Sequence, residues 1–184
     1  MPRHADPKLE GRILEAARKL WHKGGEKALS MRAVAKAAGT NTPAVYRRFR
    51  GREGILRAMV QSYQLELFRA VEPCRSLQEV GQRYLDFALR HPREYQLIMS
   101  GLLARMTKSR PNFEFVLGRT SQWVGGSAED RRGLLLALWA LLHGTATLKL
   151  SGTMPDEDFS HARAAMADAI EVLVANASKS CAPG

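Results

Sequence analysis

The sequence predicts an all-α protein of about nine helices, with a short three-helix N-terminal part and a longer helical C-terminal part. Three observations support this fold class. Apolar residues recur at spacings of three and four along most of the 184-residue chain. No stretch alternates convincingly at the period of a β-strand. Glycine, proline and capping residues stand where the apolar runs begin and end. With 45% hydrophobic and 25% charged residues, the composition excludes disordered, collagen-like and disulfide-scaffold classes.

Helical periodicity begins close to the N-terminus. Six apolar residues recur there at helix spacing, namely Leu9, Ile13, Ala16, Ala17, Leu20 and Trp21. Gly24-Gly25 is expected to end this first helix, because glycine readily adopts the left-handed backbone of a helix terminus. A longer helix is predicted over about 52–71 and connects two domains, which we place at 1–56 and 57–184.

Between these two helices, the stretch from Ser30 to Phe49 predicts two short helices joined by a tight turn. Ser30 can cap the first helix, Gly39 permits the turn, and Pro43 suits the first turn of the second helix. Val45 and Phe49, four residues apart, are expected to pack inward. The outward residues of the second helix are then Thr42, Pro43, Tyr46 and Arg47. This is a helix-turn-helix arrangement, whose second helix enters the DNA major groove.

The basic charge is concentrated in the same part of the chain. Of 28 Lys and Arg and 18 Asp and Glu, residues 1–60 hold 14 and 5, a net charge of +9, which leaves +1 for the remainder. Such asymmetry indicates nucleic acid or an anionic membrane surface as a partner. On charge alone, a solvated face that serves solubility is the alternative.

Membrane association and export are not expected. The longest uncharged run, 133–148, has sixteen residues, whereas a bilayer span needs about 20. The first twelve residues are charged throughout and lack the apolar core of a signal peptide. We therefore expect a cytoplasmic protein without a membrane partner.

Five further helices are predicted after residue 75. Their N-terminal signals are the Ser76/Glu79 capping box, Pro92, Pro111, the Ser127/Asp130 capping box and Asp156. The helix after Ser127 is apolar nearly all round between Gly133 and Leu142, so it must be covered on more than one side. Its own domain is one cover and a second subunit is the other, unless it is the central helix of a monomer.

In its N-terminal part, the sequence resembles the TetR family of bacterial transcription regulators. The signature of that family continues from the turn glycine through a Leu/Val-Tyr pair and a Phe to a Lys-Glu pair and a Leu, and the stretch from Gly39 to Leu56 follows this order and spacing. Ile13 to Trp21 is similar to the first helix of the family. Three residues depart from the pattern: Thr40 replaces an apolar residue, Asn41 a Ser, and Arg52 a Lys.

The resemblance implies roles for individual residues. Base-edge candidates are Thr42, Pro43 and Arg47. Phosphate-backbone candidates are Asn41, Tyr46 and Arg52. Ser30, Arg32 and Arg48 complete the expected DNA-binding set. The implied function is a ligand-responsive regulator, most simply a repressor, which binds a pseudo-palindromic operator as a homodimer with half-site centres about 34–36 Å apart, or a multiple of that distance.

The C-terminal part is similar to a subgroup of the family named after a Trp/His-Gly element, here Trp139 to Gly144 after His91-Pro92. This resemblance implies an effector-binding core and a dimer interface formed by the last two helices. For a small, apolar effector of unknown identity, the candidate residues are Tyr84, Phe87, Tyr95, Met99, Met106, Trp123, His143 and Thr147. Aromatic and Met residues at helical spacing are more often plain core residues. The last helix also has apolar residues at coiled-coil-like steps. The expected interface residues are Leu138, Leu142, Phe159, Ala162, Met166, Ala169 and Leu173.

Other functions are less well supported by the sequence. GxSxG, HExxH, P-loop and GxGxxG elements are missing, so no catalytic residue, cofactor or metal site is expected and the chain is not predicted to be an enzyme. The acids at 156–158 are explained by their place at a helix N-terminus. Two alternatives remain, namely a helical ligand-binding or scaffolding protein without operator binding, and a helical enzyme without a recognisable motif.

Overall fold

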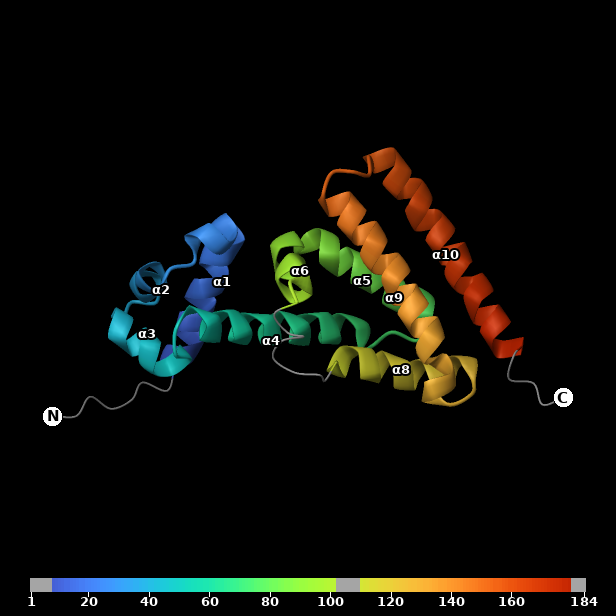
Figure 1. Ribbon diagram of the computed structural model, residues 1–184, viewed down its shortest axis with the longest axis horizontal. Coiled ribbons are helices and arrows are strands. Elements are labelled where there is room, and N and C mark those ends of the chain that lie inside the picture. Colours follow the sequence, from blue (N-terminus) through green and yellow to red (C-terminus); the bar gives the residue numbers. More distant parts are fainter. Residues whose placement is uncertain (1–7, 102–109, 180–184) are drawn as a thin grey trace. The chain divides into compact units, whose positions relative to one another are not determined.

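The computed structural model describes residues 8–101 and 110–179, which contain nine helices and no strand, so the all-α prediction is confirmed (Figure 1). The chain forms two compact units. The N-terminal unit comprises Met1–Leu65 and Arg93–Met106, and the C-terminal unit comprises Glu66–Pro92 and Thr107–Gly184. The first division falls after Leu65 and not after residue 56, and the later segment Arg93–Met106 also groups with the N-terminal helices.

The N-terminal unit is built on α1 (Leu9–Ala28), α2 (Met31–Ala37), α3 (Thr42–Phe49) and the first part of α4 (Arg52–Val71). From Arg93 on, α6 (Pro92–Met99) also belongs to this unit. α1 does not stop at the glycine pair: Gly25 leaves helical geometry at φ 59°, and one further turn reaches Ala28. The most deeply buried side chains of this unit include Ile13, Ala17, Val34, Val45, Ile55, Met59 and Val60.

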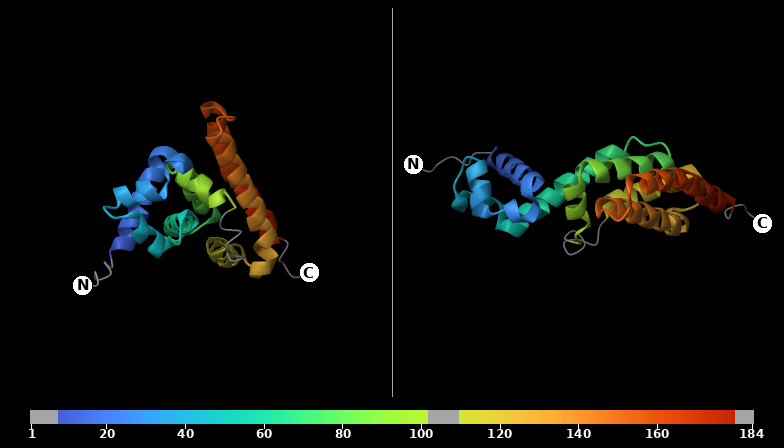
Figure 2. Two further views of the ribbon diagram at one scale, coloured as in Figure 1. Left: turned by 60° about the vertical axis from the view of Figure 1, so that its left-hand side comes forward. Right: turned by 90° about the horizontal axis from the view of Figure 1, so that it is seen from above.

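The C-terminal unit consists of the rest of α4 with α5 (Leu77–Arg90), α8 (Pro111–Val124), α9 (Ala128–Leu150) and α10 (Asp156–Lys179). α9 packs against α5, α8 and α10, and it lies beside α10 in Figures 1 and 2. α5 approaches closely at Gly81, where a Cβ atom would lie only 3.1 Å from Ile170 and 3.3 Å from Leu142. A side chain at this position would press against both α9 and α10.

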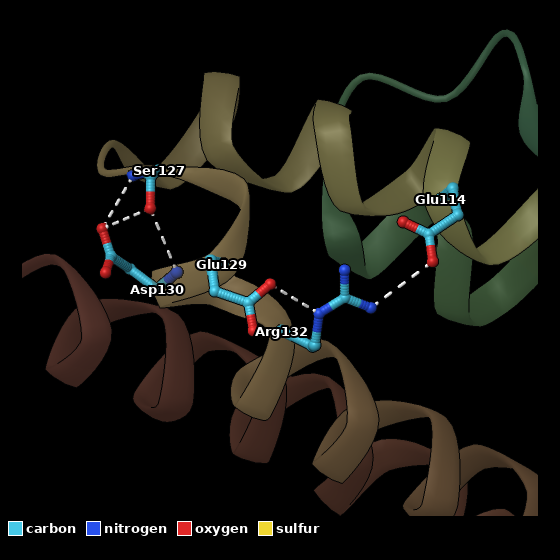
Figure 3. A network of polar contacts seen from close by, with 5 residues as sticks. All are labelled: Glu114, Ser127, Glu129, Asp130 and Arg132. Atoms are coloured by element: carbon cyan, nitrogen blue, oxygen red, sulfur yellow. Dashed lines mark hydrogen bonds and ion pairs between the residues drawn. The ribbon is translucent and has the colours of Figure 1, made fainter.

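Polar contacts fix the start of α9 (Figure 3). The Ser127 hydroxyl accepts a hydrogen bond from the Asp130 backbone at 3.2 Å, and the Asp130 carboxylate accepts one from the Ser127 backbone at 2.9 Å, which is the predicted capping box. Arg132 donates to Glu129 at 2.8 Å and to Glu114 of α8 at 3.4 Å. These contacts define where α9 begins and link it to α8.

Candidate nucleic-acid interface

The predicted helix-turn-helix is formed by α2 and α3. The Ser30 hydroxyl accepts a hydrogen bond from the Ala33 backbone at 3.1 Å, and the Asn41 side chain accepts one from the Ala44 backbone at 2.9 Å. Between the two helices, Gly39 has φ 64°, a left-handed conformation that favours glycine. Each helix therefore starts at the residue that caps it.

The two sides of α3 differ in burial. Ala44, Val45 and Phe49 face the core of the N-terminal unit. Tyr46 is 52% exposed although it is a large aromatic residue. The other exposed residues of the predicted set on or next to α3 are Asn41, Pro43, Arg47 and Arg48, whereas Thr42 is half-buried. Pro43, Tyr46 and Arg47 are spaced by three and four, so they share one side of the helix.

The sequence around this surface carries only positive charge. Residues 30–52 include Arg32, Lys36, Arg47, Arg48, Arg50 and Arg52 but no Asp or Glu. Ser30 and Arg32, at the start of α2, are both exposed. Two acids of the flanking helices pair within their own helix, Glu15 with Lys19 at 2.7 Å and Glu53 with Arg57, whereas Glu26 of α1 pairs with Arg52 at 3.0 Å. A polyanion that approaches α3 would meet no carboxylate from α2 or α3.

Arg52 has intramolecular partners that the sequence did not predict. Its guanidinium donates to the backbone carbonyl of Leu29 at 3.1 Å, and to the backbone carbonyl and carboxylate of Glu26 at 3.3 and 3.0 Å. These acceptors lie at the end of α1. The resemblance predicted a phosphate contact for Arg52 and gave no sign of these hydrogen bonds. No sequence pattern connects residues that are 23 to 26 positions apart.

A second unpredicted contact joins α6 to α1. The Trp21 indole donates to the Arg93 carbonyl at 3.2 Å, and Arg93 donates to the His22 carbonyl. His22 lies 3.3 Å from a carboxylate oxygen of Glu94, a residue that is only 5% exposed. The other Glu94 oxygen is buried without a hydrogen-bond partner. These contacts hold the first turn of α6 on the N-terminal unit.

The nominated effector residues do not gather in one unit. Tyr84, Phe87, Trp123, His143 and Thr147 belong to the C-terminal unit, whereas Tyr95 and Met99 belong to the N-terminal unit. Met106 lies outside the described residues. Thr147 is exposed on α9, and its place in an effector site stays a prediction.

Trp139 lies at the centre of an aromatic group that the nomination missed. Its indole donates a hydrogen bond to the Tyr84 hydroxyl at 3.2 Å. The ring centroids of Phe113 and His143 lie 6.4 and 6.2 Å from it. Arg110 lies over the same ring at 5.9 Å. Elsewhere in the unit, Trp123 lines a hollow of about 250 Å³ with Arg75, Ser76, Leu77, Gln78, Val124 and Val174.

The expected interface residues divide between the interior and the surface of the C-terminal unit. Leu138, Leu142, Phe159 and Met166 are buried within the chain itself, so their assignment to a subunit interface is corrected. Ala162 and Ala169 are half-buried, and Leu173 is 37% exposed. The large apolar residues exposed on the two helices are Leu136, Leu141, Leu148, Val172 and Leu173.

Small and polar residues complete the outer surface of α9. Ala137, Ala140 and Thr147 are exposed between the exposed leucines, and Gly133 is exposed one turn before Leu136. Among the described residues, α9 is the one helix long and apolar enough to span a membrane, and only 28% of its most apolar window is buried. A helix of this composition with so much exposed surface calls for a further cover.

Two family models match the chain, one over the helix-turn-helix part and one over the C-terminal helices. The family model described as "Bacterial regulatory proteins, tetR family" matches residues 13–59, and the one described as "Tetracyclin repressor-like, C-terminal domain" matches residues 77–173. A search of curated proteins gave no match.

Several solved structures share the fold. A protein of unknown function from Rhodococcus sp. RHA1 matches with a TM-score of 0.72 and 22% identity over 92% of this chain and 95% of the other. A single-residue variant of TetR from Acinetobacter baumannii AYE, in complex with minocycline, gives 0.67 and 19% over 97% and 99%. The multidrug binding protein EbrR, complexed with imidazole, gives 0.58 and 24% over 94% and 93%. With a capped helix-turn-helix and family models on both parts of the chain, this protein belongs to the TetR family of bacterial regulatory proteins.

Proposed function

We propose that this regulator is a cytoplasmic repressor, which binds a pseudo-palindromic operator as a homodimer and is released by a small apolar effector. The observation that carries the proposal is the surface of α3, where a largely exposed Tyr46 and two arginines stand on a stretch without acids. Such a helix suits the major groove, because it offers hydrogen-bond donors and positive charge at its accessible side.

In this proposal, Pro43, Thr42 and Arg47 contact base edges. Asn41 and Tyr46 contact phosphates, with Ser30, Arg32 and Arg48 as further contacts. Arg47 suits a base contact because a guanidinium can donate two parallel hydrogen bonds to guanine. The family pattern and the exposure of these side chains support the assignment.

The homodimer is proposed to form through the outer surfaces of α9 and α10. Leu136, Leu141 and Leu148 supply large apolar side chains from α9, and Val172 and Leu173 supply them from α10. The small residues Gly133, Ala137 and Ala140 on the same helix would let a partner helix approach closely. This surface replaces the buried residues that sequence spacing selected. With two α3 helices in one dimer, the half-site centres are expected about 34–36 Å apart or a multiple of that distance.

The effector site is proposed to lie in the C-terminal unit beside the aromatic group of Tyr84, Trp139 and His143. Aromatic side chains with a few polar atoms are typical of sites for small, largely apolar ligands. EbrR and the Acinetobacter protein were solved with imidazole and minocycline, which supports a ligand-responsive role. An effector opposes the operator if it favours a conformation that binds DNA less tightly.

Selection of random DNA with the purified full-length protein tests operator binding. We expect a pseudo-palindromic sequence, and a logarithm of affinity that falls linearly with the logarithm of salt concentration. Arg47→Ala should lose about 1–3 kcal/mol of discrimination at one base position, whereas Tyr46→Phe should weaken binding to all sequences alike. Arg90→Ala, an exposed arginine of α5, is the control and should bind normally. Failure to enrich any sequence would favour the ligand-binding or scaffolding alternative.

Sedimentation tests the proposed interface separately. Ala140→Glu and Val172→Glu each place a charge on an exposed apolar surface and should give monomers at micromolar concentration. Gln82→Glu, on the exposed side of α5, should leave the dimer intact. A wild-type monomer, or dimers of both interface variants, would contradict this surface.

A further inference from the structure

Arg52 is the first residue of α4, and its side chain reaches back to the end of α1. The guanidinium is 38% exposed and makes three hydrogen bonds there, two to backbone carbonyls of Glu26 and Leu29 and one to the Glu26 carboxylate. The donors are two different nitrogens of the planar guanidinium, Nε to Leu29 and Nη2 to Glu26. A lysine, which is usual at this position in the family, has a single nitrogen and cannot reproduce this geometry.

Two of the three acceptors are backbone carbonyls at the C-terminal end of α1, where the Glu26 carbonyl also accepts a 3.3 Å hydrogen bond from the Leu29 backbone. α1 breaks helical geometry at Gly25 and ends at Ala28, so the carbonyls of Glu26 and Leu29 lie in and just after its last turn. The last carbonyls of a helix are unsatisfied and carry partial negative charge. A cation that donates to them stabilises the helix end, and the contact is stronger because the donor is charged.

The backbone of Arg52 lies close to the end of α3, whereas its side chain contacts the end of α1. Only Arg50 and Gly51 separate α3 from α4, and both have positive φ angles, 51° and 105°. The Arg50 backbone donates to the Tyr46 carbonyl at 2.9 Å, which closes the end of α3. Gly54, in the first turn of α4, packs against the Phe49 carbonyl so closely that a Cβ atom would overlap it. The start of α4 and the end of α3 therefore form one tight corner.

We propose that Arg52 is a positioning residue, which fixes the direction of α3 by holding the α3–α4 corner on the end of α1. Short loops already connect α1 to α2, α2 to α3 and α3 to α4. The Arg52 hydrogen bonds add a direct link from the start of α4 back to the end of α1. Arg52 then acts on DNA binding through the placement of Pro43 and Arg47 and not by neutralising a phosphate. The inference rests on the proposed function of α3 in reading DNA.

Four variants of the full-length protein separate the two roles. Arg52→Gln removes the guanidinium, Arg52→Lys keeps the charge, and Glu26→Ala removes the carboxylate partner. Arg57→Gln is the matched control, because Arg57 lies one turn further along α4 and pairs with Glu53. Affinity for the selected operator is measured against salt concentration, and hydrogen exchange of the amides at the end of α1 and in α3 is measured without DNA.

The positioning role predicts weaker operator binding for Glu26→Ala, by about threefold or more, although this change removes a negative charge from the basic unit. Arg52→Gln should weaken binding by about tenfold with an unchanged salt slope, and Arg52→Lys should not restore it. The amides at the end of α1 should exchange faster in Arg52→Gln and Glu26→Ala but not in Arg57→Gln.

A phosphate contact predicts the opposite pattern. Arg52→Gln would then lower the salt slope by about one contact, Arg52→Lys would bind normally, and Glu26→Ala would bind more tightly. Any of these three results, or unchanged exchange at the end of α1, would overturn the positioning role. If the wild-type protein selects no operator, the proposed function fails, while the exchange measurement still decides whether Arg52 holds the corner.

Discussion

Replacement of Gly54 by alanine is expected to displace the recognition helix. The new Cβ atom would overlap the carbonyl oxygen of Phe49 and lie 2.7 Å from its carbonyl carbon, whereas ordinary van der Waals contact starts at 3.4 Å. The corner between α3 and α4 must therefore open by more than the roughly 0.7 Å that the contact with the carbon alone requires, because the overlap with the oxygen is deeper. Backbone atoms cannot rotate aside as a flexible side chain can. Such overpacking costs about 1–3 kcal/mol or more, against a gain of about 0.5–1 kcal/mol in helix propensity.

The expected net loss is about 2 kcal/mol, which corresponds to a fall in Tm of about 4–8 °C. Thermal unfolding by circular dichroism measures it, and operator affinity should fall as well because Arg47 moves with α3. Gly11→Ala is the matched control, since Gly11 lies in α1 of the same unit with no atom within 4 Å of a new Cβ. That variant should gain about 0.5–1 kcal/mol. Equal Tm values for Gly54→Ala and Gly11→Ala would refute the packing argument.

Three further predictions concern single contacts. Gly81→Val should cost about 1–3 kcal/mol, measured by urea unfolding, because the side chains that a Cβ would meet at 3.1 and 3.3 Å belong to two helices packed on α5. Trp21→Phe should destabilise the chain by about 1–2 kcal/mol and speed amide exchange in α6, since the Arg93 carbonyl loses its donor. Hydrogen bonds from Ser127 lower the pKa of Asp130, so its stabilising effect is present above the unfolded-state pKa and is lost as pH falls through the lower, folded-state value. Urea midpoints of Asp130→Asn should therefore fall less than those of the wild type between about pH 5 and 2, and parallel profiles would contradict this.

Capping residues and apolar spacing were sufficient to predict the helices and to place the DNA-binding surface on α3. Ser30 and Asn41 cap the helices that their side chains predict, because capping acts over three residues and depends little on the rest of the chain. The exposure of Tyr46 and Arg47 follows from the inward packing of Val45 and Phe49 on the same short helix. Both features follow from residues adjacent in sequence.

Long-range choices could not be predicted in the same way. α9 is apolar nearly all round, so its composition does not indicate which side the chain covers. Spacing therefore selected Leu138 and Leu142 for the interface, whereas packing against α5, α8 and α10 buries them and leaves Leu136 and Leu148 outside. The residues predicted to line an effector site likewise belong to both compact units. Helical spacing carries no information about which helices pack against each other.

Neighbouring residues and composition are enough to predict the all-α fold, the caps, the turn at Gly39 and the concentration of positive charge around α3, because none of these depends on how distant segments pack. Tertiary packing was needed to show that α6 joins the N-terminal unit through Trp21 and that Arg52 reaches the end of α1. These contacts connect residues 23 to 72 positions apart, and a donor and its acceptor at such separations meet only when the helices between them have packed.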